Sequence, residues 1–255
     1  MSISIDFKGK NILITGGTKG IGKGIAETFL KANACVFVCA RNSPKKIPKV
    51  GSNTAKYIYC DVKDPVSIEK TINEIIKKYQ SIDVLINNAG GGPMTEAATT
   101  PIKLSESIVK LNLLAPFYVG QQANSIMQKQ KFGGNIINIC SVSVLRPTPG
   151  AAVYGSAKAG LANLTQSLAI EWAPKVRVNA IVCGLIQTEQ SEKYYGNKES
   201  LQEVSNTIPL NRMGLPEDVG KGCLFLASEL ANYISGATLE IHGGGERPHY
   251  QNAID

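Results

Sequence analysis

Short apolar runs alternate along the chain with longer segments in which apolar residues recur at spacings of three and four. The first run, Asn11–Thr15, is followed by such a segment, in which Ile21, Ile25 and Phe29 share one face of a helix. Further runs are predicted as strands at 34–40, 56–60, 84–87, 135–140, 177–182 and 238–241. Strands that are apolar almost throughout and alternate with helices form parallel sheets covered on both faces. The pattern therefore predicts an α/β fold with a mostly parallel, seven-stranded sheet.

Helical spacing is clearest in four segments. The segment 66–79 is amphipathic, and the segment from Tyr154 to Trp172 carries apolar residues along one face. Further helices are predicted at 216–226 and over 103–131, where Pro116 predicts a kink or a break. No internal repeat, low-complexity tract or linker interrupts the pattern, so residues 1–255 are predicted to form a single domain.

The connection Cys183–Met213 breaks this alternation. A long segment without a clear pattern inside a compact domain is usually functional. Because it follows the carboxyl end of a strand, it is expected over the crevice in which open α/β sheets bind ligands. Its apolar residues are Leu185, Ile186, Tyr194, Tyr195, Leu201, Val204 and Ile208. We expect residues 184–213 to close over an apolar pocket as a substrate lid, with a purely structural excursion as the alternative.

The amino-acid composition indicates which class of protein this is. Of the 255 residues, 43% are hydrophobic and 18% are charged, which is typical of a soluble globular chain. No apolar run reaches the roughly 18 residues of a membrane span, and the N-terminus has no signal-peptide layout. The six cysteines form no C-x-x-C pair and lie mostly in apolar stretches, which favours reduced core residues in a cytoplasmic protein. Two histidines near the C-terminus exclude a His-rich metal site, and no metal is expected.

The net charge of +7 raises the question of a nucleic-acid partner. The lysines stand in short scattered clusters, no aromatic residues interleave with them, and no nucleic-acid motif is present. We therefore interpret them as solvated lysines and expect neither a nucleic-acid nor a membrane partner. Their field can still attract phosphorylated ligands.

Tyr154 and Lys158 are four residues apart on a predicted helix and therefore share a face. A nearby ammonium group favours the ionised form of a phenol, the reference pKa of which is ~10. A tyrosine tuned in this way can exchange a proton with a carbon-bound oxygen. Ser141, just after the strand 135–140, can add a hydrogen bond to the same oxygen. Taken alone, the Tyr-x-x-x-Lys spacing also fits a half-buried helix start with a surface lysine.

A glycine-rich turn, Gly16–Gly22, joins the first strand to the first helix. Strand, glycine-rich turn and helix form the layout of a dinucleotide-binding fold, in which the diphosphate lies over the helix N-terminus. The spacing T-G-x-x-x-G-x-G is one residue wider than the usual G-x-G-x-x-G. We interpret the chain as a doubly wound Rossmann fold with helices on both faces of the sheet. The alternative is a glycine-rich turn without a ligand.

Together these residues resemble the classical short-chain dehydrogenase/reductase family, from Lys10 to about Gly244. The motifs that carry the resemblance, in family order and spacing, are Thr15–Gly22, Asp61-Val62, Asn87–Gly90, Ser141, Tyr154-x-x-x-Lys158 and Arg177–Ala180. The resemblance implies an oxidoreductase that interconverts a carbonyl and a secondary alcohol. It also implies a homotetramer, in which the segments 111–130 and 157–172 pair across two-fold axes.

The resemblance further implies roles for individual residues. Tyr154 would be the general acid/base, Ser141 would orient the substrate carbonyl, and Lys158 would bind the nicotinamide ribose and lower the Tyr154 pKa. Asn112 would hold a water in a proton relay. Besides Tyr154 and Lys158, the residues implied to bind the cofactor are Gly16, Thr18, Gly20, Ile21, Gly22, Asp61, Val62, Asn88, Ala89, Gly90, Ile186 and Thr188.

Residues at the end of the second strand favour NADP(H) over NAD(H). In dinucleotide folds an acidic residue at this position binds the adenosine ribose and would repel a 2′-phosphate. Here the strand ends in Ala40 and Arg41 follows, and Arg41 offers a bidentate fork for phosphate. Lys19 in the glycine turn can approach the same phosphate. The alternative is that both cations only face solvent, with NAD(H) as the cofactor.

Within the family the chain looks most like bacterial 3-oxoacyl thioester reductases, so a 3-oxoacyl thioester or a similar apolar ketone is the expected substrate. Three segments depart from that pattern: Cys183-Gly184 in place of Pro-Gly, the longer segment 91–100, and the tail 245–250. Because the last two flank the expected pocket, a CoA-linked or polycyclic, steroid-like ketone is an alternative substrate. Two other functions remain open, an NAD-dependent alcohol dehydrogenase and an inactive nucleotide-binding scaffold.

Overall fold

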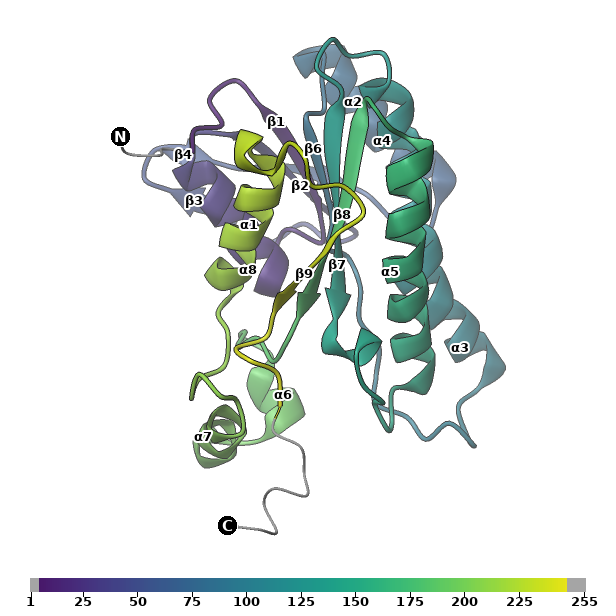
Figure 1. Ribbon diagram of the computed structural model, residues 1–255, viewed down its shortest axis with the longest axis vertical. Helices are drawn as coiled ribbons and strands as arrows, with labels where there is room; N and C mark the ends of the chain where they lie inside the picture. Colours follow the sequence, from purple (N-terminus) through teal and green to yellow (C-terminus); the bar gives the residue numbers. More distant parts are fainter. Residues whose placement is uncertain (1–4, 247–255) are drawn as a thin grey trace.

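Seven parallel strands form the central sheet of the computed structural model, which describes residues 5–246 (Figure 1). Across the sheet the strands lie in the order β5, β2, β1, β6, β7, β8, β9, and every neighbouring pair is parallel. In chain order they are β1 (Asn11–Thr15), β2 (Cys35–Ala40), β5 (Lys56–Tyr59), β6 (Val84–Asn87), β7 (Gly134–Ser141), β8 (Val176–Cys183) and β9 (Thr238–Ile241). The predicted α/β fold with a seven-stranded sheet is confirmed.

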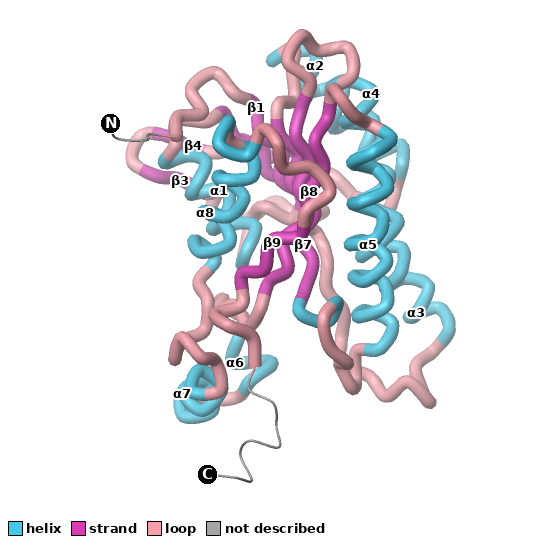
Figure 2. Tube along the Cα trace, viewed as in Figure 1, coloured by secondary structure: helices cyan, strands magenta, loops and turns pink. Residues whose placement is uncertain are grey.

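Helices cover both faces of this sheet (Figures 1 and 2). On one face α1 (Gly20–Lys31) packs along α8 (Pro216–Ala227). The other face is covered by α2 (Pro65–Tyr79), α4 (Ala115–Met127) and α5 (Ala152–Glu171). This is the doubly wound Rossmann arrangement that the sequence predicts. Within residues 5–246, no helix combines the length and the hydropathy needed to cross a lipid bilayer.

The alternation of side chains along each strand divides the core between the two faces. In β1, Ile12 and Ile14 pack into the cluster beneath α1 and α8, whereas Leu13 between them packs into the cluster beneath α2 and α4. All three side chains are almost fully buried. Full burial of one such side chain is worth about 1.5–3 kcal/mol, so both helical layers are held to the sheet by the strands' own periodicity.

The predicted helix over 103–131 is interrupted in an unexpected way. α3 (Ile102–Val109) continues through a π-helical turn, η1 (Lys110–Leu114), into α4. The amide of Ala115 donates to the carbonyl oxygen of Lys110, five residues earlier. Pro116 therefore lies in the first turn of α4, where its missing N–H is tolerated. The proline marks a change of helix type rather than an end of the helix.

Two further segments differ from the sequence prediction. Residues 49–54 form a hairpin of two very short strands, β3 (Lys49–Val50) and β4 (Asn53–Thr54), which is too short for a periodicity argument to detect. The predicted lid, 184–213, contains two short helices, α6 (Ser191–Tyr195) and α7 (Lys198–Asn206). Short helical turns also follow β7 and α8, as η2 (Val142–Val144) and η3 (Glu229–Ala231).

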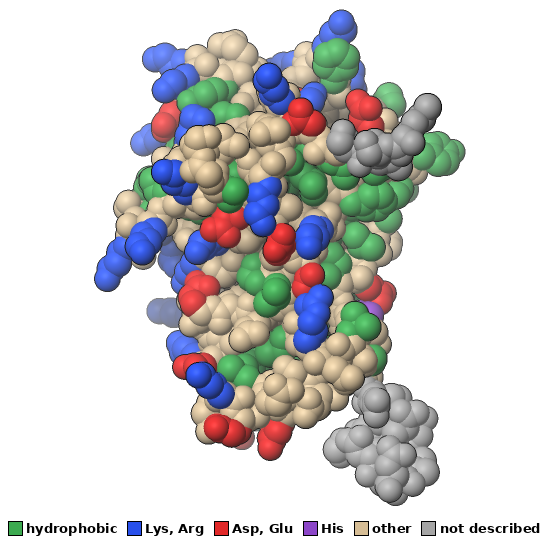
Figure 3. All heavy atoms as spheres, turned by 90° about the vertical axis from the view of Figure 1, so that its left-hand side faces the viewer, with side chains coloured by type: hydrophobic (Ala, Val, Ile, Leu, Met, Phe, Trp, Pro, Cys, Tyr) green, Lys and Arg blue, Asp and Glu red, His purple; other side chains and the backbone are tan. Residues whose placement is uncertain are grey.

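Lysines on the face formed by α1 and α8 are interspersed with acidic side chains (Figure 3). Glu217 of α8 lies 3.1 Å from Lys31 Nζ and 3.7 Å from Lys221 Nζ, and Lys23 pairs with Glu27 at 3.7 Å. These exposed pairs each contribute little to stability. This mixed arrangement agrees with the interpretation of the lysines on this face as solvated side chains.

Candidate active site

Because all seven strands run in one direction, their carboxyl ends meet at one edge of the sheet. The predicted site residues follow these ends: the glycine turn after β1, Arg41 after β2, Asp61 after β5 and Asn88 after β6, whereas Ser141 is the last residue of β7. The strand order reverses between β1 and β6, which is where open α/β sheets bind ligands. The topology thus brings residues from distant parts of the chain to one crevice.

The glycine turn is fixed by the segment that follows β6. A Cβ on Gly22 would lie 2.3 Å from the carbonyl oxygen of Gly16, so only glycine fits there. Asn88 Nδ2 donates to the carbonyl oxygens of Thr15 and Gly16 at 2.9 and 3.1 Å. The backbone amides of Asn88 and Ala89 donate to Thr15 Oγ1, each at 3.0 Å. The motifs after β1 and β6 therefore act as one structural unit.

An anionic group lies at the N-terminus of α1. The backbone N–H of Gly20, which has a φ of 53°, donates to Oε1 of Glu189 from the lid at 3.0 Å. Backbone amides and the helix dipole favour anions at such a position. The Glu189 carboxylate stands in for an oxygen of a diphosphate, so the turn fits a dinucleotide. Thr18 and Ile21, also predicted to bind the cofactor, lie in the same turn and are partly buried.

The end of β2 presents a cation toward the same edge. Ala40 ends the strand, and its carbonyl oxygen accepts a hydrogen bond from the Tyr57 hydroxyl at 3.0 Å. Arg41, the next residue, is exposed, as is Lys19 in the glycine turn. After β5, the backbone N–H of Asp61 donates to Ser67 Oγ at 3.0 Å, and Val62 is buried. These positions agree with an adenosine site bordered by two cations.

Lys158 is a buried residue, with only 3% of its surface exposed. Its Nζ donates to the carbonyl oxygen of Ile139 in β7 at 2.7 Å and lies 5.9 Å from the centre of the Tyr154 ring. Burial lowers the Lys158 pKa, and the buried thiols of Cys140 and Cys183 act in the opposite direction. A surface lysine, the alternative left open by the sequence, is therefore excluded.

Gly90 lies close to both Lys158 and Asn112. A Cβ on Gly90 would lie 2.8 Å from Asn112 Oδ1 and 3.2 Å from Lys158 Nζ. Asn112, fully buried in the π-helical turn, donates to the carbonyl oxygens of Gly91 and Ile108 at 2.9 Å and accepts from the Gly91 amide at 2.8 Å. Single π-turns occur frequently at functional sites. Here the turn places Asn112 beside Lys158.

The pKa of Tyr154 is raised to about 12, which is the opposite of the predicted direction. Burial of the phenol is the largest cause, whereas the side chain of Ser141, within hydrogen-bonding reach, lowers the pKa. The prediction that Lys158 lowers this pKa is wrong for the arrangement seen here. Lys158 Nζ is bound to the Ile139 carbonyl and lies over the Tyr154 ring, 5.9 Å from its centre, and burial of the phenol has the larger effect on the pKa. Tyr154 is therefore protonated at neutral pH.

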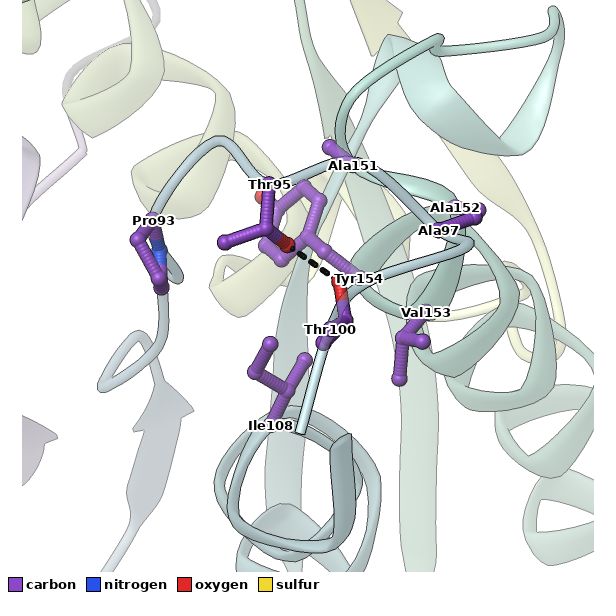
Figure 4. A pocket seen from close by; sticks show the side chains of 9 residues that line it. All are labelled: Pro93, Thr95, Ala97, Thr100, Ile108, Ala151, Ala152, Val153 and Tyr154. Carbon is purple, nitrogen blue, oxygen red and sulfur yellow. Dashed lines mark hydrogen bonds between the residues drawn. The ribbon is translucent and has the colours of Figure 1, made fainter. Parts of the chain in front are cut away.

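The longer segment 91–100 packs over Tyr154 (Figure 4). The amide of Thr95 donates to the Gly150 carbonyl oxygen at 2.7 Å, and Thr100 Oγ1 lies 2.9 Å from Thr95 Oγ1. Pro93, Thr95 and Thr100 line a small pocket together with the Tyr154 ring. The segment that departs from the family pattern thus forms one wall beside the predicted proton donor.

The first part of the lid meets the glycine turn. Ile186 is buried and pairs with Gly214 in an isolated parallel bridge. The Thr188 amide donates to Ser191 Oγ at 2.8 Å, and a Cβ on Gly20 would lie 3.6 Å from Thr188 Cγ2. Of these two residues predicted to bind the cofactor, Thr188 therefore lies against the glycine turn, whereas Ile186 is part of the core.

Cys183-Gly184, which replaces the usual Pro-Gly, is also accommodated. Burial raises the pKa of the Cys183 thiol to about 12, so it is a neutral core residue. A Cβ on Gly184 would lie 2.7 Å from the Cα of His242, which explains why glycine is kept there.

A cavity of about 180 Å³ opens beside Val142, the residue after Ser141, between the segment after β7, the lid and the segment after β9. Its polar residues include Arg146 and Glu246, which form an ion pair at 2.5 Å. The sequence argument missed both of these residues and also Glu189. Each takes part in a contact between residues at least 100 positions apart, for which no local motif exists.

Known proteins resemble this chain over nearly its whole length. A family model described as enoyl-(acyl carrier protein) reductase matches residues 16–246. The chain is 36% identical over 241 residues to 3-oxoacyl-[acyl-carrier-protein] reductase from Rickettsia typhi, covering 94% of this chain and 98% of that relative. It is 34% identical to glucose 1-dehydrogenase 2 from Bacillus subtilis, covering 94% and 95% of the two chains.

Among solved structures, the aldohexose dehydrogenase of Thermoplasma acidophilum matches with a TM-score of 0.86 and 30% identity. The match covers 93% of this chain and 94% of that one. The similar proteins thus share one fold and differ in the alcohol or ketone that their names specify.

Proposed function

The chain belongs to the short-chain dehydrogenase/reductase family, and we propose that it is an NADP(H)-dependent oxidoreductase that interconverts a ketone and a secondary alcohol. The observation that carries the proposal is the half-buried Tyr154 with the buried Lys158 beside it and Ser141 close by, at the crevice formed by the strand ends. These three groups can bind and protonate a carbonyl oxygen at a single point.

The proposed mechanism assigns each group one task. Ser141 donates a hydrogen bond to the substrate carbonyl and orients it. Tyr154, which holds its proton at neutral pH, transfers that proton to the same oxygen as the carbonyl is reduced. Lys158 and Asn112, which both lie close to Gly90, keep the surroundings of the phenol in place. When bound, the nicotinamide cofactor supplies the hydride.

Several features support NADP(H) as the cofactor. The fixed glycine turn and the amide of Gly20 would hold the diphosphate, and Asp61, Val62 and Asn88–Gly90 would hold the adenosine side. Exposed Arg41 and Lys19 offer charge-assisted hydrogen bonds to a 2′-phosphate, each worth roughly 1.5–3 kcal/mol. NAD(H) would gain nothing from these two cations.

We propose a 3-oxoacyl thioester or a similar apolar ketone as the substrate. The likeness to 3-oxoacyl-[acyl-carrier-protein] reductases and the apolar side chains of Val142, Leu145, Leu185 and Ile208 in the cavity support this choice. The likeness to glucose 1-dehydrogenase 2 and to an aldohexose dehydrogenase favours, as a second candidate, oxidation of a polyhydroxylated alcohol.

The proposal is tested by steady-state kinetics of the purified protein with an acetoacetyl thioester and with NADPH or NADH. We expect reduction of the ketone and a kcat/KM that is higher for NADPH. The double variant Ala40→Asp with Arg41→Ala should shift the preference toward NADH, by about tenfold or more. Equal use of both cofactors by the wild type, or no shift in the double variant, would contradict the cofactor assignment.

We also propose that the chain forms one domain and acts in the cytoplasm. Residues 184–213 would be its substrate lid.

We further propose that the protein assembles as a homotetramer. In α5, Ile170 is 81% exposed, and Phe117 and Tyr118 of α4 are only partly buried. Such apolar side chains on neighbouring helices favour a partner surface. Light scattering at micromolar concentration should give four times the mass of the chain, and a monomer would refute the assembly.

A further inference from the structure

Three hydroxyl groups form a hydrogen-bonded chain that ends at Ser141. Ser141 Oγ lies 3.2 Å from Ser143 Oγ, and Thr148 Oγ1 lies 3.0 Å from the same Ser143 oxygen. All three side chains are partly buried. Because the side chain of Ser141 is also within hydrogen-bonding reach of Tyr154, the chain leads from Thr148 to the proposed proton donor.

The backbone holds this chain of hydroxyl groups in place. The Ser143 amide donates to Ser141 Oγ at 3.3 Å, at the start of η2. A Cβ on Gly155 would lie 3.5 Å from the carbonyl oxygen of Ser143 and 3.6 Å from its Cβ, so Ser143 packs against the first turn of α5. The Thr148 carbonyl oxygen accepts from the amide of Ala151 at 3.0 Å, in the turn that leads into α5. The position of Ser143 is therefore set by the segment after β7 and by α5 together.

The direction of the hydrogen bonds along the chain matters for Ser141. A hydroxyl group has one proton to donate and two lone pairs that accept. In the proposed mechanism Ser141 donates its only proton to the substrate carbonyl, which it cannot do while that proton is bound to Ser143. If Thr148 donates to Ser143, then Ser143 can donate to Ser141. The Ser141 proton is then left for the substrate.

The same direction also affects Tyr154. Ser141 Oγ accepts from the Ser143 amide, so a second hydrogen bond, from the Ser143 hydroxyl, would occupy both of its lone pairs. The Tyr154 hydroxyl would then find no acceptor at Ser141, and its proton would remain available to the substrate oxygen. One proton from Ser141 and one from Tyr154 would thus point to the same oxygen.

We propose that Ser143 and Thr148 are positioning residues, which act through Ser141 by directing its hydroxyl proton toward the substrate carbonyl. The inference rests on the proposed ketone reduction, because Ser141 has this task only in that reaction. Hydrogen bonds in a chain polarise one another, so a Ser141 hydroxyl that accepts from Ser143 is also a stronger donor. Neither positioning residue needs to touch the substrate.

Two variants test the chain with an acetoacetyl thioester and NADPH. Ser143→Ala removes the middle hydroxyl, and Thr148→Val removes the outer one with little change of shape. We expect each to lower kcat roughly three- to tenfold, the effect of one lost hydrogen bond, with little change in KM or in the thermal unfolding midpoint. Thr148→Ser keeps the hydroxyl and should retain most of the wild-type kcat. Thr54→Val is the matched control, because Thr54 is exposed in β4, and it should leave kcat unchanged.

A double-mutant cycle separates this role from a structural one. Because Thr148 acts through Ser143, the double variant Ser143→Ala with Thr148→Val should have the same kcat as Ser143→Ala alone. In the same way, Ser143→Ala should have no further effect once Ser141 is replaced by alanine. Losses that multiply in either pair would show independent roles and overturn the inference.

The outcomes also separate this inference from the proposed function. Turnover of no ketone by the wild type would overturn the proposed function and this inference with it. Ketone reduction by the wild type, with kcat unchanged in both Ser143→Ala and Thr148→Val, would overturn only the roles of these two residues. A change confined to KM or to the thermal unfolding midpoint would show that the hydroxyl groups serve binding or folding, which also contradicts the proposal.

Discussion

Two regions border the crevice, and they are built differently. The catalytic shelf, which consists of Ser141, Tyr154, Lys158, Asn112 and Gly90, lies on β7, α5, the π-turn and the segment after β6, with Asn112 and Lys158 buried. The lid, 184–213, is anchored by buried residues such as Ile186 and Ile208, but it contains α7, a helix without a single buried residue, and its Glu189 contacts the Gly20 amide. A rigid shelf can fix the chemistry, while a loosely packed lid can vary the ligand.

Replacing Tyr154 by phenylalanine should have the largest effect, because it removes the proposed proton donor and nearly preserves the packing of the ring. We expect kcat to fall by roughly 10²–10⁴-fold, the range that general acid–base catalysis supplies. Cofactor affinity and the thermal unfolding midpoint should stay close to those of the wild type. A variant that keeps more than about a tenth of the wild-type kcat would remove Tyr154 from its proposed role.

Gly90→Ala tests whether the shelf is as rigid as its contacts indicate. The new Cβ would lie 2.8 Å from Asn112 Oδ1 and 3.2 Å from Lys158 Nζ, so one of these buried groups has to move. Overpacking of this kind costs about 1–3 kcal/mol of stability, and we expect kcat to fall about tenfold or more. Gly92→Ala is the control, because its Cβ would meet only Ile108 at 3.5 Å or more. Equal activity of the two variants would argue against a rigid shelf.

Glu189→Ala tests the lid and should act on binding rather than on chemistry. Its carboxylate holds the Gly20 amide, so a diphosphate has to displace it. Without this competitor and its negative charge, we expect the Kd of NADPH to decrease about threefold or more, measured by calorimetry. Glu192→Ala, which changes another carboxylate in the lid, is the control. Weaker NADPH binding by the Glu189 variant would mean that this residue supports the cofactor instead.

The smallest expected signal comes from the Tyr154 phenol in the cofactor-free protein. Its pKa is raised to about 12, so it should stay protonated after exposed tyrosines, with a reference pKa of ~10, have begun to ionise. The phenolate absorbance of the wild type minus that of Tyr154→Phe should therefore remain near zero up to pH 10. A difference signal with a midpoint near pH 7 or 8 would show that the charge of Lys158 outweighs burial.

The sequence was sufficient to predict the helices and strands whose structure follows from local periodicity. The strand 84–87 and the helix 66–79 were predicted to within one residue, because their apolar residues follow one period throughout. The glycine turn and the Tyr154–Lys158 spacing were also recognisable, since both are local patterns within a strand–turn–helix or helical context.

The features of the site that the sequence does not predict depend mainly on packing between distant segments. The direction of the Tyr154 pKa shift follows from burial of the phenol, which spacing along a helix does not reveal. The Arg146–Glu246 pair joins residues 100 positions apart, and the lid helices α6 and α7 are too short for their apolar pattern to identify. Each of these features depends on contacts between distant segments or on a helix of few residues, so no local motif predicts it.

The central claim is that this site reduces a ketone with hydride from NADPH and a proton from Tyr154. It is tested most directly by incubating the purified protein with an acetoacetyl thioester and stereospecifically 4-deuterated NADPH, followed by mass spectrometry of the product. The account predicts a secondary alcohol that carries one deuterium on the carbinol carbon, formed in equal amount to the NADPH consumed. NADPH that binds but is never consumed, across thioester and simple ketones alike, would contradict the account.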